Sequence, residues 1–382
     1  MPPSTLPVAE EQNRGSSKQS VTTPVIRVLL FAPSLEILGG QAVQAERLVR
    51  ELRRDPSLFI EFQPINPKLP TLLRWLQNIK YIRTVSTFLY YVPLVLLRVP
   101  RYDVIHIFSA SYWSYTLWSL TPLLIGRLFG KKTIINYRSG EADDHLTNWR
   151  TAIPTLKLAH EIVAPSGYLV DVFARYGLKI RSISNILDSE PFIYRKRRKL
   201  RPVFLTNRIL EPLYNVGCVL RAFHIVQKKY PDASLTIAHD GICRPELEKL
   251  ADELGLRNTR FIGRVPHAQV PELYNSADIY LTSPDLDCMP GSILECFASG
   301  LPVVATKAGG IPYILKDGET GLLVNCNDHE AMAQCCLRLL EDEELVERLT
   351  DRAYNEISRY EGDAVRQHWS GLYKKLAGRA ER

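Results

Sequence analysis

No cysteine occurs before Cys218 in this chain of 382 residues, and none of its seven cysteines is spaced from another as CxxC. Structural zinc sites and the disulfide frameworks of small secreted domains both need regularly spaced cysteines. The spacing excludes both and favours a reduced compartment. A membrane-spanning helix needs roughly 18 consecutive apolar residues, and the sequence has no uninterrupted run of that length. We therefore expect a cytoplasmic protein without a spanning helix.

Residues 1–24 lack the apolar centre of a secretory signal and are instead rich in Ser, Thr, Pro, Gln and Glu. Such a composition buries too little apolar surface to offset the entropy that is lost on folding. We therefore expect residues 1–24 to form a disordered tail.

Acidic residues are missing from residues 62–102. The basic residues of this stretch are Lys68, Arg74, Lys80, Arg83, Arg98 and Arg101. The imbalance extends over the first half of the chain, because residues 25–200 hold 25 Lys and Arg against 13 Asp and Glu, whereas residues 201–382 hold 21 against 26. One half of the protein is therefore expected to face an anionic partner.

Aromatic residues accompany these basic ones, and the stretch from Trp75 to Arg101 has two interpretations. It can be an ordinary pair of helices, broken at Pro93 because proline interrupts a long helix. It can also be a surface that rests on anionic lipid and presents a lipid-linked acceptor to the rest of the protein.

Short β-branched or apolar runs alternate with helical patterns along the chain. The strands expected in the first half are residues 25–31, 103–108, 131–136 and 161–164. Those expected in the second half are residues 203–206, 234–238, 260–263, 278–282, 302–306 and 321–324. Strands that alternate with helices indicate parallel sheets covered on both faces. We therefore predict an α/β protein with two doubly wound, Rossmann-like domains that face a central cleft.

The boundary between these domains is expected near the basic run at residues 195–201. Such a run can be read as a nuclear signal or a nucleic-acid patch, but we interpret it as a solvated linker and expect no nucleic acid partner. The first domain then covers residues 25–195 and the second residues 196–360. Residues 361–382 have one apolar helical face and are expected to return to the first domain.

The segment from Ser283 to Thr306 is the most informative part of the sequence. Its helix is predicted to begin at Gly291 and Ser292, at the carboxyl end of a parallel sheet, where open α/β sheets bind ligands. The free N–H groups of Gly291, Ser292 and Ile293, together with the helix dipole, suit a diphosphate. Asp287 and Glu295 can bind sugar hydroxyls. In the alternative interpretation Ser292 and Glu295 form a capping box, which needs no ligand.

This segment resembles the retaining glycosyltransferases of the GT-B fold, often called family four. The resemblance rests on the acidic pair Asp287 and Glu295, the helix of small residues, the strand that follows Gly300 and the turn at Gly309-Gly310. It extends over nearly the whole chain after residue 25. It implies that the protein moves a sugar from a nucleoside-diphosphate sugar to an acceptor hydroxyl and keeps the anomeric configuration, without a metal or a cofactor.

The resemblance also implies roles for individual residues. Arg208 would bind the donor diphosphate, Glu295 the ribose hydroxyls and Asp287 the transferred sugar, so these three are the catalytic candidates. The other donor-binding candidates are Gly39, Gly40, Gly263, Arg264, Met289, Pro290, Gly291, Ser292 and Ile293. Asn185 and Asp188 match the family's strand-end Asn and nearby Asp, and we expect them to shape the interdomain turn.

The sequence departs from the family pattern in three places. Asp287 stands where the family usually has Glu, and residues 211–215 lack the usual phosphate-binding Lys. Arg138 occupies the place of a His that contacts the sugar. His145, seven residues later, is a second candidate for this contact, and its alternative is a solvated histidine on the surface. Asp285 and Asp287 resemble a metal-binding pair, although the family transfers sugar without metal.

Two other functions remain open from the sequence. One is a nucleotide-sugar epimerase of the same fold, and the other is a catalytically weak protein that only binds the nucleotide sugar. For a transferase, the expected acceptor is a glycan or a lipid-linked molecule of polysaccharide assembly. The expected location is the cytoplasm, in part as a peripheral protein on the inner face of the membrane.

Overall fold

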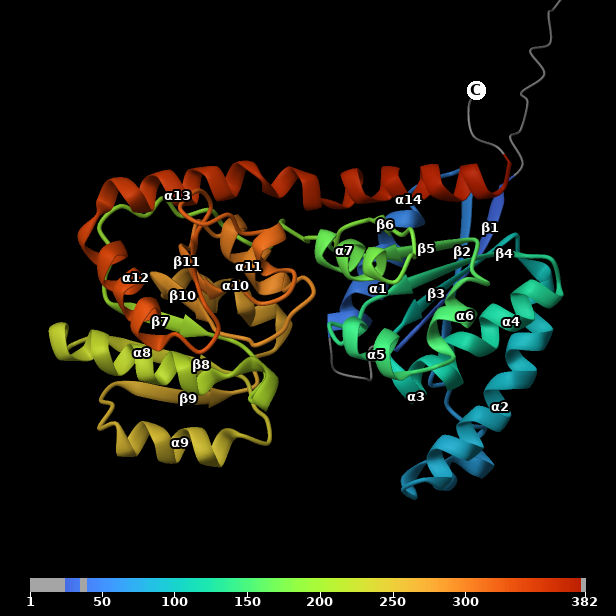
Figure 1. Cartoon of the computed structure of the whole chain (residues 1–382), viewed down its shortest axis with the longest axis horizontal. Helices are drawn as coiled ribbons and strands as arrows, with labels where there is room; N and C mark the ends of the chain where they lie inside the picture. The colour runs from blue at the N-terminus through green and yellow to red at the C-terminus, as the bar shows by residue number, and fades with distance from the viewer. Residues whose placement is uncertain (1–24, 35–39, 379–382) are drawn as a thin grey trace, which may run out of the picture.

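A computed structural model describes residues 25–34 and 40–378; residues 1–24, where we expected a disordered tail, lie outside the described residues. The chain forms two six-stranded parallel sheets, one in each half of the described sequence (Figure 1). The strand order is β2-β1-β3-β4-β5-β6 in the first sheet and β12-β11-β10-β7-β8-β9 in the second. This architecture confirms the predicted α/β class with two Rossmann-like domains.

The strands of the first sheet are β1 (Ile26–Ala32), β2 (Leu58–Pro64), β3 (Val104–Ser109), β4 (Lys132–Tyr137), β5 (Glu161–Ala164) and β6 (Arg181–Ser182). Those of the second are β7 (Val203–Thr206), β8 (Ser234–Ala238), β9 (Thr259–Gly263), β10 (Ile279–Thr282), β11 (Val303–Thr306) and β12 (Leu322–Val324). All ten predicted strands are present. The prediction missed β2 and β6, which are edge strands of the first sheet and therefore less apolar than the central ones.

The helices of the first domain are α1 (Gly40–Leu52), α2 (Ile82–Arg98), α3 (Tyr112–Ser114), α4 (Leu120–Leu128), α5 (Ala142–Asn148), α6 (Ala152–Leu156) and α7 (Gly167–Arg175). Those that follow are α8 (Val216–Lys229), α9 (Arg244–Glu253), α10 (Val270–Ser276), α11 (Gly291–Ala298), α12 (His329–Glu341), α13 (Glu343–Asn355) and α14 (Gly362–Leu376). They cover both faces of each sheet, as the alternation of strands and helices predicts.

Helix α14 lies against the first domain, although the residues before it belong to the second (Figure 1). Its apolar face is buried in the same core as β1 and α1, and the members from α14 are Val365, Trp369, Leu372 and Tyr373. The core of the first domain therefore contains side chains from the end of the described chain.

The basic run at residues 195–201 is solvated only in part: Lys196, Arg198, Lys199 and Arg201 are exposed, whereas Arg197 is buried. The guanidinium groups of Arg195, Arg197 and Arg201 surround the carboxylate of Asp278, which is 3% exposed and directly precedes β10. Arg197 also donates to the carbonyl oxygens of Tyr274 and Ala277, each at 3.1 Å. Burial lowers the pKa of Arg197 to about 10. A buried acid at a strand end thus fixes the segment to the second domain.

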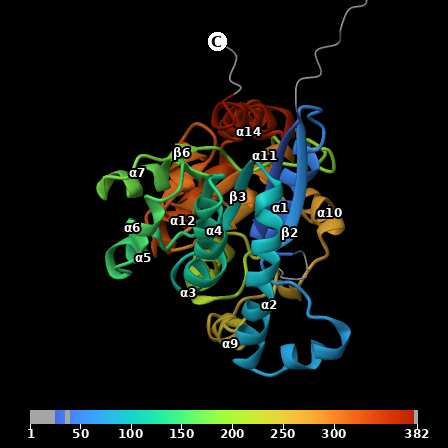
Figure 2. The same cartoon turned by 90° about the vertical axis from the view of Figure 1, so that its right-hand side faces the viewer.

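Helix α2 continues through Pro93, which was expected to break it. Tyr91 and Val95, on either side of the proline, are fully buried, and the Tyr91 hydroxyl donates to the carbonyl of Trp118 at 3.1 Å. Tertiary packing therefore holds the helix together where the local preference opposes it. Together with the short helix η1 (Thr71–Asn78), the start of α2 extends away from the sheet (Figure 2).

Within the described residues, one helical segment, Ile82–Arg101, is long and apolar enough to span a membrane by length and composition alone. Only 22% of the apolar stretch within this segment is buried. We did not expect such a segment from the sequence, because charged residues and Pro93 interrupt its apolar run.

Candidate active site between the two domains

A cavity of about 760 Å³ lies between the two domains and has walls from both. The start of α1, the end of β4 and the interdomain turn form one wall, and the loops after β7 and β9 and the start of α11 form the other. The candidate residues that line it are Gly40, Arg138, Arg208, Arg264, Asp287, Met289, Pro290, Gly291, Ser292 and Glu295.

The remaining donor-binding candidates flank this cavity or fall outside the described chain. Gly263 directly precedes Arg264 and has a φ of +72°, which favours glycine. Ile293 is fully buried beneath the first turn of α11. Gly39 lies outside the described residues.

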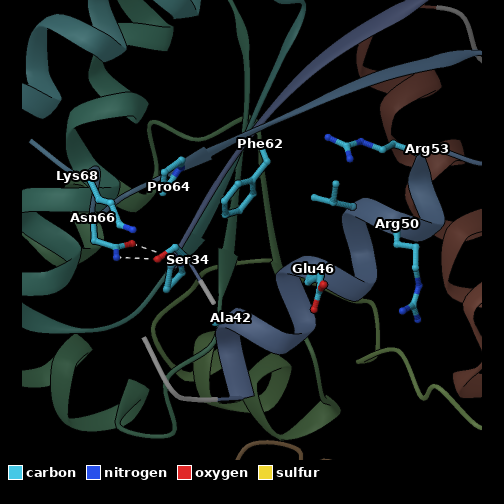
Figure 3. A pocket seen from close by; sticks show the side chains of 11 residues that line it. Ser34, Ala42, Glu46, Arg50, Arg53, Phe62, Pro64, Asn66 and Lys68 are labelled. Carbon is cyan, nitrogen blue, oxygen red and sulfur yellow. Dashed lines mark hydrogen bonds between the residues drawn. The ribbon is translucent and has the colours of Figure 1, made fainter. Parts of the chain in front are cut away.

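A second cavity, of about 880 Å³, lies within the first domain between α1 and β2 (Figure 3). The Phe62 ring points into it, and two hydrogen bonds of 2.9 and 3.0 Å join Ser34 to Asn66 at its side. Its lining includes Ser34 and Ala42, which flank residues 35–39 outside the described chain. Because neither acid of the predicted pair reaches this cavity, we assign the chemistry to the cleft between the domains.

The start of α11 has no side-chain cap. Its N-cap residue is Pro290, with φ −68° and ψ 117°, and no side chain there binds the free amides. Ser292 lies within the first turn, where its hydroxyl accepts from Arg208 Nη1 at 3.4 Å. Glu295 accepts instead from the Tyr274 hydroxyl at 3.0 Å. The capping-box interpretation is therefore wrong, and the helix N-terminus is open toward the cleft.

Arg208 follows β7 and forms an ion pair with Asp287 in the loop before α11. Burial by itself lowers the pKa of Arg208, but the neighbouring Asp287 carboxylate, together with Tyr280 and Tyr214, outweighs it and raises that pKa above its ordinary value. The guanidinium carbon lies 4.4 Å from the centre of the Tyr214 ring. Tyr214 belongs to the segment that lacks the expected lysine, so an aromatic face supports Arg208 where the family pattern has a second cation.

Glu295 contacts a residue of the opposite domain that we did not predict. Its Oε1 lies 3.7 Å from Nη2 of Arg47, a residue of α1 that is 4% exposed. The same Nη2 lies 2.9 Å from His267 Nε2, and Nη1 donates to the carbonyl of Ile186 at 3.1 Å. Arg47 thus joins the first domain, the interdomain turn and the second domain at the edge of the site.

The sequence feature that could have indicated a role for Arg47 is a row of polar residues along one face of α1, beside its apolar face. Gln44, Arg47 and Glu51 recur at spacings of three and four residues, and each is at most 8% exposed. In the sequence alone this row is indistinguishable from a solvated helix face, because segments far along the chain bury it: the interdomain turn covers Gln44, the second domain contacts Arg47 and the start of α14 covers Glu51.

Gly309 and Gly310 form the predicted turn and lie directly against the acidic loop. Gly309 has a φ of +50°, and a Cβ on it would lie 2.3 Å from the carbonyl oxygen of Asp287. A Cβ on Gly310 would lie 1.7 Å from the carbonyl oxygen of Cys288. The Gly310 amide donates to the Asp287 carbonyl at 2.7 Å. Only glycine allows this approach, so the pair fixes the backbone that carries Asp287.

Arg138 is held on both sides by amide oxygens. It donates to Asn136 Oδ1 at 3.3 Å and to Asn185 Oδ1, and its guanidinium carbon lies 4.8 Å from the centre of the Phe108 ring. Burial lowers the pKa of Arg138 to about 10. Asn185 in turn donates from Nδ2 to the carbonyl of Met289 at 3.2 Å. Arg138 therefore lines the cleft as a fixed cation.

His145 does not reach the cleft, and it is not a solvated surface residue either. It is fully buried, its Nδ1 lies 2.9 Å from the Tyr137 hydroxyl, and burial lowers its pKa to about 4. Aromatic rings surround it because α5 turns this face into the core. In this structure the prediction of a sugar contact is wrong for His145.

Asp285 and Asp287 have different partners: Asp285 Oδ1 accepts from Asn215 Nδ2 at 3.2 Å, whereas Asp287 pairs with Arg208. Among residues 25–34 and 40–378, no three His, Cys, Asp or Glu residues are grouped so that they could hold a metal ion.

Comparison with known proteins agrees with this geometry. Residues 192–356 match the family described as glycosyl transferases group 1. Over 164 residues the chain is 31% identical to a D-inositol 3-phosphate glycosyltransferase of Corynebacterium kroppenstedtii, a match that covers 41% of this chain and 36% of that protein. It is 26% identical over 305 residues to a phosphatidyl-myo-inositol mannosyltransferase of Mycobacterium leprae, which covers 75% of this chain and 78% of the relative.

The fold has close structural counterparts. A structure of the Anabaena protein HepE in complex with UDP and glucose superposes with a TM-score of 0.71 at 17% identity, covering 91% of this chain and 99% of that one. At this identity the likeness shows the fold alone. Residues 192–356 are thus similar to the group 1 glycosyltransferases, and the described residues have the GT-B fold.

Proposed function

We propose that this protein is a retaining hexosyltransferase that moves a sugar from a nucleoside-diphosphate sugar to an acceptor hydroxyl. The observation that carries the proposal is the ion pair of Arg208 and Asp287 beside the uncapped N-terminus of α11. A guanidinium and free helix amides are the groups that bind a diphosphate. The names of the matched glycosyltransferases and the UDP in the HepE structure support it.

The proposed reaction needs no strong protein base. The acceptor oxygen attacks the anomeric carbon from the face that the phosphate leaves, and the leaving phosphate takes the acceptor proton. As the bond between the anomeric carbon and the phosphate breaks, negative charge develops on the diphosphate, and this charge lets the departing oxygen take the proton. Arg208 and the amides of Gly291 and Ser292 stabilise this charge because they are fixed before the reaction begins. Glu295 binds the ribose and Asp287 the transferred sugar.

Nucleotide binding gives the first test. A ligand at about 100 times its Kd stabilises the folded chain by about 2.7 kcal/mol, so we expect the correct nucleoside diphosphate to raise the Tm by several degrees. Glu295→Gln removes a charged acceptor of the ribose hydroxyls and is expected to weaken this nucleotide by about tenfold. The measurement is a thermal-shift titration with nucleoside diphosphates and their sugar conjugates.

Glu272→Gln is the matched control, because Glu272 is exposed on the neighbouring helix α10. Equal shifts in the parent and Glu295→Gln would contradict the ribose assignment. A nucleotide shift without transfer to any acceptor would support the alternative of a nucleotide-sugar-binding protein, which the tyrosine in place of lysine favours. Donor consumption without an acceptor would instead indicate an epimerase.

The proposed acceptor is a glycan or a lipid-linked molecule, reached from the inner face of a membrane by a cytoplasmic protein. The supporting feature is the surface formed by η1 and the first half of α2, which we call the η1–α2 surface. Leu72, Tyr81 and Leu89 on it are 86%, 75% and 67% exposed. Exposed apolar side chains beside Arg74 and Arg83 suit the interface of an anionic bilayer.

Vesicle binding tests the η1–α2 surface. We expect the protein to sediment with vesicles that contain phosphatidylglycerol and not with pure phosphatidylcholine. Leu72→Glu combined with Leu89→Glu replaces two inserted apolar side chains by charges and is expected to reduce binding at least about tenfold. Leu128→Glu, on α4, is a control of similar exposure, 77%. Binding that ignores anionic lipid content would rule out this surface as proposed.

A further inference from the structure

We propose that Arg138 and Asn185 are positioning residues, which fix Asp287 through the backbone of Met289 and are themselves fixed by a buried chain that ends at Tyr373 of α14. The inference rests on the proposed function, because it assigns to Asp287 a contact with the transferred sugar. It differs from the expectation that Arg138 itself takes the place of a sugar-binding histidine.

This series of buried hydrogen bonds begins in the loop before α11, which carries Asp287 and Met289. Asn185 makes two hydrogen bonds to Met289, one from Nδ2 to the carbonyl oxygen at 3.2 Å and one from its backbone N–H to the sulfur at 3.3 Å. The amide of Met289 donates to Oδ1 of Asp287 at 3.2 Å. A displacement of Asn185 therefore moves the backbone that carries and orients the Asp287 carboxylate.

Arg138 determines how the Asn185 amide is oriented. It donates to Oδ1 of Asn185, so the NH₂ group of that side chain must face Met289. Its other hydrogen bond goes to Oδ1 of Asn136 at 3.3 Å. Arg138 forms no ion pair with any described residue, in contrast to Arg208. Its two amide partners therefore hold it in place, and it is not free to swing toward a ligand.

His106 links Asn136 to Tyr373 at the inner end of this series of hydrogen bonds. Because Asn136 Oδ1 faces Arg138, its NH₂ group faces His106 Nε2, at 3.1 Å, and that nitrogen must accept. The proton of the neutral ring then lies on Nδ1 and is donated to the Tyr373 hydroxyl at 2.7 Å. His106 is fully buried, and its ring stacks on Trp369 of α14 with centroids 4.4 Å apart.

The hydrogen bonds that link these residues each join a donor to an acceptor for a single choice of amide orientations and histidine tautomer. Buried polar groups with one consistent pattern select one geometry, because any displacement leaves a desolvated donor without a partner. The chain connects α14, the centre of the first sheet and the interdomain turn to the loop before α11. The last helix thus contributes to the position of a sugar-binding carboxylate in the other domain.

The test uses the methionine methyl groups of the full-length protein as probes. The protein has only three methionines. Met289 lies in the cleft, whereas Met332 is fully buried in the core of the second domain. With ¹³C-methyl methionine, we expect the Met289 signal to shift in Asn185→Ala and in Tyr373→Phe. The Met332 signal is expected to stay unchanged in both variants.

Tyr115→Phe is the matched control. Tyr115 is fully buried in the first domain, as Tyr373 is, and its hydroxyl also forms one hydrogen bond of 2.7 Å, to Thr155 outside the chain. Both Tyr→Phe variants should lose similar thermal stability. Only Tyr373→Phe should move the Met289 signal, and it should lower kcat for transfer while the donor KM stays within about twofold. Asn185→Ala should lower kcat about tenfold.

The outcomes separate this inference from the proposed function. An unchanged Met289 signal in Tyr373→Phe, or an equal shift in Tyr115→Phe, would refute the proposal that these hydrogen bonds position Asp287. A shift confined to Tyr373→Phe and Asn185→Ala would establish it, even if the parent protein transferred no sugar, and in that case only the proposed reaction would fail.

Discussion

Arg208→Ala is expected to lower kcat/KM for sugar transfer by about 10²–10³-fold, the cost found when one preorganised stabiliser of transition-state charge is removed. The charge on the leaving diphosphate develops only as the bond breaks, so the loss should fall mainly on kcat. Tyr214 cannot replace the missing cation, because a phenol ring carries no positive charge at neutral pH. The measurement is steady-state kinetics with the donor identified by thermal shift.

The folded state should survive this substitution. Arg208 and Asp287 both line the cleft, so water can reach the Asp287 carboxylate once the guanidinium is gone. Arg260→Ala, an exposed arginine on β9 of the same domain, is the control and should transfer sugar as the parent does. Transfer by Arg208→Ala at a rate near that of the parent would remove Arg208 from the site.

Gly310→Ala should have the second large effect, both on stability and on transfer. A Cβ at this position would lie 1.7 Å from the carbonyl oxygen of Cys288, and two backbone segments must separate to admit it. Overpacking of this kind costs about 3 kcal/mol, and here the displaced backbone is the one that carries Asp287. We expect a lower Tm and a loss of transfer of at least about 100-fold.

Gly371→Ala separates this effect from the general effect of adding a methyl group. Gly371 lies within α14 with no atom near an added Cβ, so alanine should be neutral or stabilise the helix by up to about 1 kcal/mol. Calorimetry and transfer assays on both variants give the comparison. If Gly310→Ala retained the parent's Tm and activity, the acidic loop would not depend on this contact.

The fold could be predicted because its signals are local. A buried parallel strand is a short apolar run, and ten such runs were recognised. Strand β2 was missed because its pattern is irregular: buried Leu58 and Ile60 alternate with Phe59 and Glu61, but Gln63 is buried and Phe62 is only half-buried. Helix α2 continues through Pro93 because Tyr91 and Val95 pack into the core. This is a tertiary effect that the local sequence does not reveal.

The residues of the candidate site likewise fall into those that are close together in the sequence and those that only the tertiary structure brings together. Asp287, Glu295 and the start of α11 lie within one short segment, so their proximity follows from the sequence. Arg47, Arg138 and its partner Asn185 come from segments far apart along the chain, and only the packed domains bring them together. His145 was misplaced because its acidic neighbours suggested solvent, whereas α5 turns the ring inward.

The docking of α14 also determines when the first domain can mature. Its sheet is synthesised first, but the surface that covers β1 and His106 includes Trp369 and Tyr373, which are synthesised only after the second domain. Until then, an apolar face and a polar histidine stay open to water. The second domain contains its own core and can fold in the meantime. The second domain can thus be completed before the first, although it is synthesised later, and a nascent first domain exposes apolar surface until α14 arrives.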